Sequence, residues 1–356
     1  MRNLLKWAKG LAKRSPALPR NHQNIKFPII DSSLIVEEEH HGIDRYYPTR
    51  IGEVLSSRYQ VVGKLGFGYS STVWLAHDLQ VHRYVALKIF TSDGQNKDEI
   101  AIYKHLKDGK KSHAGYRYVR AAIDSFELSS GENIKADNIM HYIEDKSILT
   151  AFEEEEFVDP SPRKQEGDRD IYLTRNFNHP VSYGEPVLCE FGAAVYGNKE
   201  NDREAYPQVY RCPEVMLHTT WTYSADIWNV GVMIWDIYEG KHLFTGHDSA
   251  RDRYTTRAHL QELISVLGPP FLDLLKRGKR TAEVFDENGQ WLEPDAENPD
   301  RLPSLPSSSL ESREENLEGE DKALFMDFIR SMLQWEPEKR KTARELLEDP
   351  WLRKGM

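Results

Sequence analysis

The strongest constraint on the fold is a change of pattern along the chain, from strand-like runs in the first third to helix-like runs in the second half. Three short runs rich in β-branched and aromatic residues, separated by glycine or polar turns, occupy residues 59–66, 71–78 and 83–90. Residues 224–240 are strongly apolar and long enough for a buried helix, and the amphipathic residues 256–268 end at a glycine followed by two prolines. The sequence therefore predicts an α+β protein with a β-rich front and a helical back.

Composition and charge exclude several classes of protein. The 356 residues suffice for one two-lobed domain or two modest ones, and 39% hydrophobic and 29% charged residues are typical of a globular chain. The formal net charge of -10 argues against direct nucleic-acid binding and suits basic partners. Cys189 and Cys212 form neither a disulfide framework nor a zinc site, which favours a reducing compartment. No apolar run reaches the roughly 18 residues of a membrane-spanning helix, and nothing indicates an oligomeric state.

The N-terminal segment, residues 1–44, differs from the rest. Its first 20 residues carry six basic side chains, and no acidic residue precedes Asp31. An apolar helical face within residues 4–12 allows a mitochondrial transit peptide or a membrane-surface helix. Sparse serine favours a flexible basic extension instead. We expect the cytoplasm or nucleus, with mitochondrial targeting as the less favoured alternative.

Two polar tracts interrupt the helical half, at about residues 153–186 and 287–320. The first begins with the acidic run Glu153 to Glu156 and contains a turn-rich Pro-Ser-Pro sequence. The second is rich in proline, serine and acidic residues. Both compositions predict surface insertions.

A glycine-rich turn stands between the first two predicted strands. Gly66, Gly68 and Ser71 have G-x-G-x-x-S spacing, and glycines let a backbone approach phosphate oxygens closely. Taken alone this pattern is more often an ordinary hairpin, just as a lone lysine is more often a surface charge. Lys88, however, ends the next strand pattern, and Glu99 follows in a predicted helix where it could pair with that lysine. The joint pattern predicts a site for nucleotide phosphates.

These residues resemble the small lobe of a eukaryotic protein kinase, and the second half of the chain agrees. Phe191-Gly192 resembles the end of the D-F-G motif, and Cys212-Pro213-Glu214 resembles A-P-E. Asp226 and Trp228 resemble the kinase central helix, and Arg340 the late arginine that pairs with the A-P-E glutamate. Residues 46–76, 134–140, 209–217 and 223–236 most resemble SR-protein kinases and their fungal relatives.

The resemblance covers about residues 45–353 and implies a two-lobed kinase fold, with a small lobe at 45–128 and a truncated large lobe at 129–353. It implies ATP and Mg²⁺ as cofactors and Arg/Ser-rich proteins as substrates. It assigns the ATP site to Leu65, Gly66, Gly68, Ser71, Val73, Ala86, Lys88 and Glu99, magnesium binding to Asn138 and Glu190, catalytic-loop positions to Asn133 and Lys135, and structural roles to Glu214, Asp226 and Arg340.

Two substitutions depart from the family at the catalytic centre. The catalytic loop has Asn133 where the family has its general-base aspartate, and an amide cannot accept the substrate's hydroxyl proton. Glu190 replaces the metal-binding aspartate of D-F-G. Its longer side chain should misplace Mg²⁺, which requires nearly ideal octahedral geometry.

A third departure is a missing segment. Only seven residues separate Phe126, at the end of a predicted strand, from Ile134 in the catalytic loop, and they span at most about 25 Å. The family places a strand, the adenine-binding hinge and two helices there, so we expect the central helix to expose apolar surface around residues 227–237. A skipped exon or faulty gene model explains the gap more simply than evolved design, although the two conservative substitutions favour relaxed catalytic constraint.

Three functions remain open from sequence alone. By family the chain is a serine/threonine kinase that transfers phosphate from ATP to Arg/Ser-rich proteins. The alternatives are a pseudokinase that binds partners and a non-functional truncated product. Glu200, Asp202 and Glu204 could attract an arginine-rich substrate, whereas Tyr196, Tyr206 and Tyr210 are interpreted as packing residues.

Overall fold

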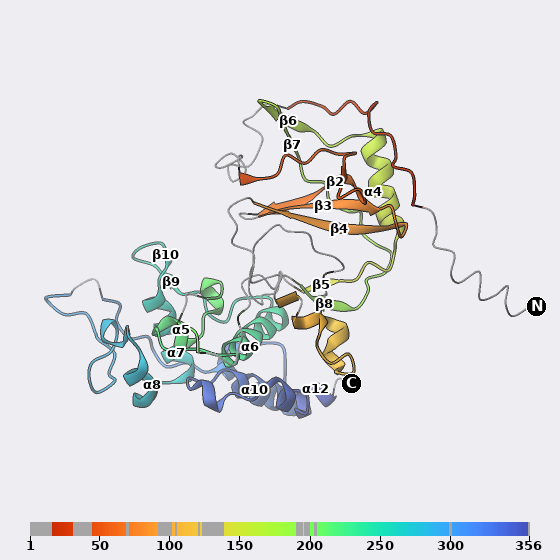
Figure 1. Ribbon diagram of the computed structural model, residues 1–356. Helices are drawn as coiled ribbons and strands as arrows, with labels where there is room; N and C mark the ends of the chain where they lie inside the picture. Colours follow the sequence, from red (N-terminus) through yellow and green to blue (C-terminus); the bar gives the residue numbers. More distant parts are fainter. Residues whose placement is uncertain are drawn as a thin grey trace, which may run out of the picture. The chain divides into compact units, whose positions relative to one another are not determined.

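The computed structural model describes most of the chain as two units (Figure 1). One unit combines Met1–Glu132 with Ile139–Ala194, and the other combines Asn133–Asn138 with Val195–Met356. The described residues are 16–30, 45–68, 71–91, 102–103, 105–119, 122, 139–189, 195, 200–202, 205–298 and 301–354.

The first unit is built on a four-stranded antiparallel sheet in the order β1-β2-β3-β4. Its strands confirm the three predicted strand runs and add a short one in front: β1 Val54–Leu55, β2 Tyr59–Gly68, β3 Ser71–Asp78 and β4 Arg83–Phe90. Two register shifts interrupt the β2–β3 pairing, between Val61 and Gly63 and between Lys64 and Gly66. Such bulges turn extra side chains toward one face of a sheet.

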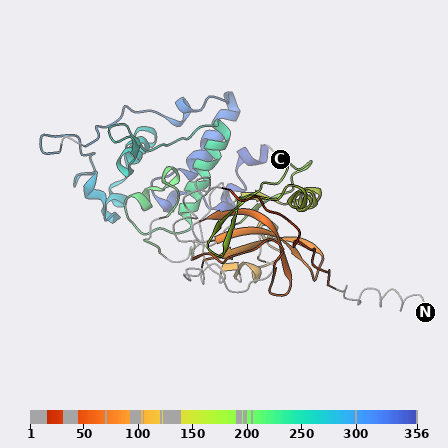
Figure 2. The ribbon, with the colours of Figure 1, turned by 90° about the horizontal axis from the view of Figure 1, so that it is seen from above.

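Both faces of this sheet are covered. On one face Val61, Trp74 and Leu87 pack against Tyr172 in a buried cluster. On the other, Val62 and Leu75 pack against three residues of helix α4 (Ser147–Val158), namely Ile148, Leu149 and Phe152. Figures 1 and 2 both show α4 beside the sheet. The alternation of apolar residues in β3 thus serves two separate layers.

Helix α4 belongs to a segment that the sequence assigned to the large lobe. The segment begins and ends with the paired strands β5 (Ile139–His141) and β8 (Pro186–Leu188), and between them it also forms the hairpin of β6 (Arg163–Glu166) and β7 (Arg169–Tyr172). It groups with the small-lobe strands because α4 and Tyr172 bury apolar side chains on them.

The surface position predicted for residues 153–186 is wrong for two residues of the acidic run, whereas Glu154 is exposed. Glu153 and Glu156 are 3% and 0% exposed. Glu153 accepts a hydrogen bond from Tyr84 and pairs with Arg20 at 3.1 Å. Glu156 accepts one from Arg175 Nε at 2.9 Å. Buried carboxylates need such partners, and these lie too far away in sequence for the local pattern to indicate them.

Part of the predicted N-terminal extension is anchored to this unit. Ala17 N donates to Leu79 O at 2.7 Å. The backbone N–H and C=O of Arg20 both bond the side chain of Gln60, at 2.8 and 2.7 Å. Ile29 forms a parallel bridge with Arg163. Residues 16–30 are therefore held by backbone bonding, which composition does not reveal, whereas residues 1–15 and 31–44 lie outside the described residues.

The second unit is helical and contains the two strongest predicted helices. Its elements are α5 Pro213–Met216, α6 Ser224–Glu239, β9 His247–Asp248, β10 Arg253–Tyr254, α7 Thr256–Leu267, α8 Leu272–Arg277, α9 Leu310–Arg313, α10 Gly319–Met332, α11 Ala343–Leu346 and α12 Pro350–Lys354. Helix α6 ends at Gly240, whose φ of 68° is left-handed, and the Thr255 side chain caps α7 by accepting from Ala258 N.

The central helix α6 carries the core of this unit. Trp228, Val232 and Trp235 are buried among residues of α5, α7 and α10. The expected exposed apolar surface appears at Ile237, which is 72% exposed, while Ile227 is buried. The predicted exposure thus holds at one end of the helix. Where it is described, the predicted insertion at 287–320 consists largely of irregular chain that contains α9 and reaches the start of α10.

The contact of α4 with β2 predicts an unequal response of two glycines in the same strand. A Cβ at Gly63 would lie 2.6 Å from Phe152 Cε1, so we expect Gly63→Ala to lower the free energy of unfolding by about 1–3 kcal/mol. In the described structure nothing lies within 4 Å of a Cβ at Gly66, which makes Gly66→Ala the matched control. Urea unfolding of the full chain measures both, and equal losses would contradict the assigned packing.

Candidate functional site

The glycine-rich turn lies at the β2–β3 connection, as predicted. Gly66 and Gly68 end β2, Ser71 begins β3, and Gly68 pairs with Ser71. A Cβ on either glycine would meet nothing within 4 Å among the described atoms. The packing of the described protein therefore does not require these glycines. Open backbone of this kind suits close approach by a phosphate.

The predicted phosphate lysine lies on the same face as this turn. In the sheet register Gly66 pairs with Val73, and Val73 pairs with Lys88 of β4, so the three positions form one row across the strands. Directly paired residues in antiparallel strands share a face. Lys88 is half-buried, and its Nζ lies 5.0 Å from the Phe90 ring centroid. The predicted partner Glu99 lies outside the described residues, so this ion pair remains a prediction.

The apolar positions assigned to the ATP site surround this row. Leu65 and Val73 are half-buried and Ala86 is exposed. Ala86 pairs with Leu75 of β3. Leu75 follows Val73 by two residues, so both lie on the same face of the sheet. These side chains leave apolar surface open beside Lys88. Such a surface can take the face of a nucleotide base, because buried base area contributes through the hydrophobic effect.

The residues assigned to catalysis and metal binding lie outside the described residues: Asn133, Lys135, Asn138 and Glu190. Their roles remain predictions. Among the residues that the structure describes, no group of three His, Cys, Asp or Glu side chains is arranged to hold a metal ion.

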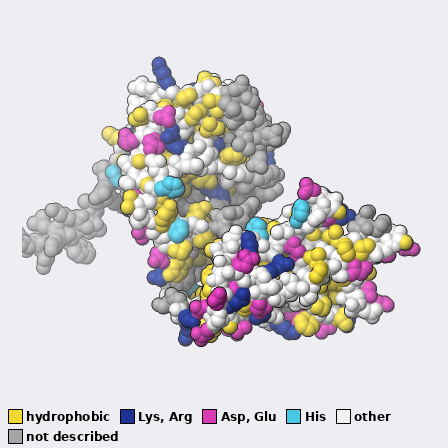
Figure 3. Space-filling model, turned by 180° about the vertical axis from the view of Figure 1, so that it is seen from behind, with side chains coloured by type: hydrophobic (Ala, Val, Ile, Leu, Met, Phe, Trp, Pro, Cys, Tyr) yellow, Lys and Arg dark blue, Asp and Glu magenta, His cyan; other side chains and the backbone are white. Residues whose placement is uncertain are grey.

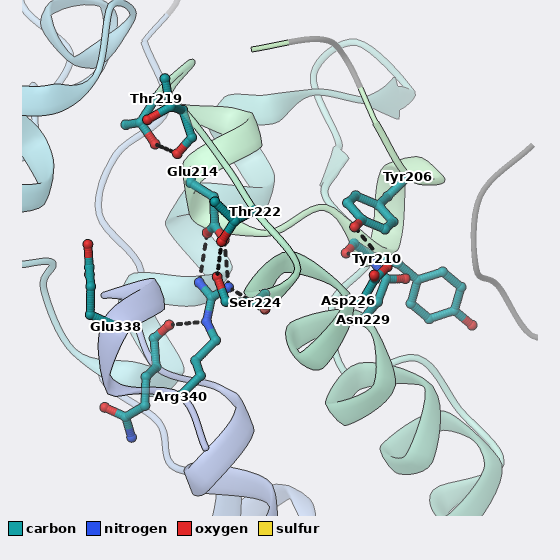
Figure 4. A network of polar contacts seen from close by, with 12 residues as sticks. Tyr206, Tyr210, Glu214, Thr219, Thr222, Ser224, Asp226, Asn229, Glu338 and Arg340 are labelled. Carbon is teal, nitrogen blue, oxygen red and sulfur yellow. Dashed lines mark hydrogen bonds and ion pairs between the residues drawn. The ribbon is translucent and has the colours of Figure 1, made fainter. Parts of the chain in front are cut away.

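The predicted pair of Arg340 and Glu214 is present and fully buried (Figure 4). The guanidinium Nη1 and Nη2 lie 2.6 and 2.7 Å from the two carboxylate oxygens, and Nη1 also donates to Ser224 O at 3.0 Å. Burial works against the charge on Arg340, but the attraction of Glu214 outweighs it and raises the pKa of the guanidinium. This bidentate pair ties α5 to the chain after α10.

Asp226 is half-buried near the start of α6, at the position predicted to support the catalytic loop. Burial raises the pKa of its carboxyl, and the hydrogen bond from Tyr206 opposes this rise. Tyr206 Oη donates to Asp226 Oδ1 at 2.9 Å (Figure 4). Tyr206 itself has a left-handed φ of 67°, which is rare for a bulky residue. The interpretation of Tyr206 as a packing residue is therefore incomplete, since it also anchors this segment to α6.

A second anchor was not predicted from sequence. Asn229 Nδ2 of α6 donates to Tyr210 O at 3.0 Å, and Tyr210 Oη donates to Asp236 Oδ2 at 3.0 Å. His242 Nδ1 lies 2.5 Å from the same carboxylate oxygen. The sequence did contain an indication of this anchor. Asn229 and Asp236 are polar residues in an otherwise apolar helix, and they are spaced so that they lie on one helical face.

The comparisons with known proteins agree with this architecture. A family model for the protein kinase domain matches residues 180–352. Across 96% of each chain, this protein is 37% identical to a serine/threonine protein kinase of Aspergillus fumigatus. The chain therefore belongs to the protein kinase family, among its serine/threonine kinases.

Two more distant relatives are similar over most of this chain. The serine/threonine-protein kinase SRPK of Physarum polycephalum is 25% identical over 90% of this chain and 93% of its own length. The dual specificity protein kinase CLK1 of Mus musculus is 25% identical over 90% of this chain and 70% of its own length.

The alignment with the fungal kinase also bears on the missing segment. It runs over 390 positions, whereas this chain has 356 residues, so at least 34 positions of the relative have no counterpart here. The loss between Phe126 and Ile134 stays a prediction from the sequence. Within the described part of the chain, no helix is both long and apolar enough to cross a membrane.

The burial of Arg340 and Glu214 predicts a large effect of breaking the pair. Arg340→Ala leaves an uncompensated buried carboxylate, so we expect it to lower the free energy of unfolding by about 3–5 kcal/mol. The matched control is Arg277→Ala, because Arg277 pairs with Glu338 on the surface and should lose at most about 1 kcal/mol. Similar urea midpoints for both variants would contradict the structural role of Arg340.

Proposed function

We propose that this chain binds ATP on strands β2–β4 and transfers phosphate, at a reduced rate, to serines of Arg/Ser-rich proteins. The observation that carries the proposal is the row formed by Gly66, Val73 and Lys88, beside glycines that the described packing leaves open. This arrangement is expected of a phosphate-binding turn whose lysine lies on a nearby strand and on the same face of the sheet.

Each residue would have a separate task. The backbone N–H groups of the glycine-rich turn would hold phosphate oxygens, and the Lys88 ammonium would fix their orientation. Lys135 would neutralise charge on the transferred group. Magnesium, held by Asn138 and Glu190, would supply charge neutralisation between phosphates. With Asn133 in the base position, catalysis would rest on positioning and electrostatic stabilisation.

The substrate class rests on charge and on the relatives. The net charge of -10 favours basic partners, and SRPK of Physarum polycephalum is among the similar proteins. Of the predicted acidic positions, Asp202 is exposed but lies 3.5 Å from Lys279 Nζ, which weakens its attraction for arginine. In Figure 3 acidic side chains are scattered among basic ones over the visible face of the helical unit. We also propose that the protein acts in the cytoplasm or nucleus.

A pseudokinase is the second candidate. It is favoured by Asn133 and by the seven residues between Phe126 and Ile134, which leave no room for an adenine-binding hinge. In this case the chain would bind partners, with or without nucleotide, and would transfer no phosphate.

Nucleotide binding is tested by thermal unfolding of the full chain. ATP with Mg²⁺ at millimolar concentration should raise the melting temperature by mass action, and Lys88→Ala should abolish most of the rise. Lys107→Ala is the control, because Lys107 is an exposed lysine of the same unit. An unchanged melting temperature of the parent protein would exclude the nucleotide site.

Phosphate transfer is tested by restoring the base. Asn133→Asp should raise transfer to an Arg-Ser peptide by about 10²–10⁴-fold, the usual contribution of a positioned base. The gain should vanish when Lys88→Ala is added. If Asn133→Asp binds ATP but remains inactive, the pseudokinase is the better description.

A further inference from the structure

One edge of β2 is lined by chain from the segment that contains α4. Strand β1 pairs only with Tyr59 and Gln60, at the beginning of β2. Further along the same strand, Arg175 N donates to Lys64 O at 2.9 Å. The side chain of Arg175 is held as well, because its Nε donates to Glu156 Oε1 at 2.9 Å. The backbone around residue 175 is therefore fixed beside β2. It lies next to Lys64, which immediately precedes Leu65 in that strand.

Phe177 follows two residues later and lies against the predicted nucleotide face. Its ring centroid is 5.2 Å from that of Phe152, and it packs on the cluster that also contacts Leu65. Phe177 is half-buried, so part of its ring remains accessible. The segment thus places an aromatic ring against the cluster beneath α4, on the face of the sheet to which Leu65 also belongs.

The two parts of this face differ in exposure. Val62 and Leu75 are 0% and 2% exposed beneath α4. Toward the glycine-rich turn, Leu65 and Val73 are only half-buried, and Ala86 is exposed. A base bound beside Lys88 would lie on this open apolar surface. Because the chain has no room for the hinge, other groups must hold the base, and stacking on an aromatic ring is one way to do so.

We propose that Phe177, supported by Phe152, contacts the base of the bound nucleotide and helps to select it. This assignment rests on the proposed nucleotide site and deepens it. Phe177 contributes an aromatic face and apolar area, whereas Lys88 and the glycines contact phosphates. Loss of the ring should therefore weaken binding of a nucleotide more than binding of phosphates alone.

The test compares ATP with inorganic tripolyphosphate, both with Mg²⁺, by calorimetric titration of the full chain. Phe177→Leu keeps apolar packing but removes the aromatic face, and we expect it to raise the Kd for ATP about tenfold while the Kd for tripolyphosphate stays within about twofold. Phe177→Tyr should bind ATP like the parent. Phe27→Leu is the matched control, because Phe27 packs against Tyr172 on the opposite face of the sheet, with ring centroids 5.1 Å apart.

Other outcomes overturn the assignment in distinguishable ways. If Phe177→Leu binds ATP like the parent, or weakens both ligands equally, Phe177 does not contact the base. If the parent binds tripolyphosphate but shows no preference for ATP, the phosphate site stands and the base site falls. If the parent binds neither ligand, the proposed nucleotide site itself is wrong and the role of Phe177 falls with it.

Discussion

Phe152 lies so close to Gly63 that a methyl group at that glycine would collide with its ring, at 2.6 Å from Cε1. This contact seats helix α4 on β2 and buries Ile148, Leu149 and Phe152 with Val62 and Leu75. Full burial of such side chains stabilises a fold by about 1.5–3 kcal/mol each. The same segment also carries Arg175, on the edge of β2, and Phe177, which packs on this cluster on the face proposed to bind nucleotide.

Two of the buried charges among the described residues show how closely such groups are matched. In the strand unit, Glu156 is enclosed but bonded by Ser161 N at 3.0 Å and Arg175 Nε at 2.9 Å. In the helical unit, Glu214 and Arg340 satisfy each other in bidentate geometry. Because an unpaired buried charge costs several kcal/mol, each pair permits little relative movement of the segments that it joins.

The kinase apparatus of this chain is unevenly preserved. The row of Gly66, Val73 and Lys88 depends only on the register of three strands, and this register is intact. The anchors of Tyr206 and Tyr210 on α6 depend only on side chains of the helical unit, and they too are intact. Asn133 and Glu190 lie outside the described residues, so the effect of these substitutions on catalysis stays a prediction.

The sequence by itself determined the three strands, the glycine-rich turn, the two long helices at residues 224–240 and 256–268, and the pairing of Arg340 with Glu214. The first three are set by local patterns, and the pairing was implied by the kinase motifs. The tertiary structure decided that Glu153 and Glu156 are buried, that residues 16–30 are anchored to the sheet, and that Phe177 packs on the cluster beneath α4. These outcomes depend on partners distant in sequence, since Arg20 and Tyr84 lie 133 and 69 residues from Glu153. An acidic run indicates surface exposure until its partners are known, and only the folded chain brings those partners together.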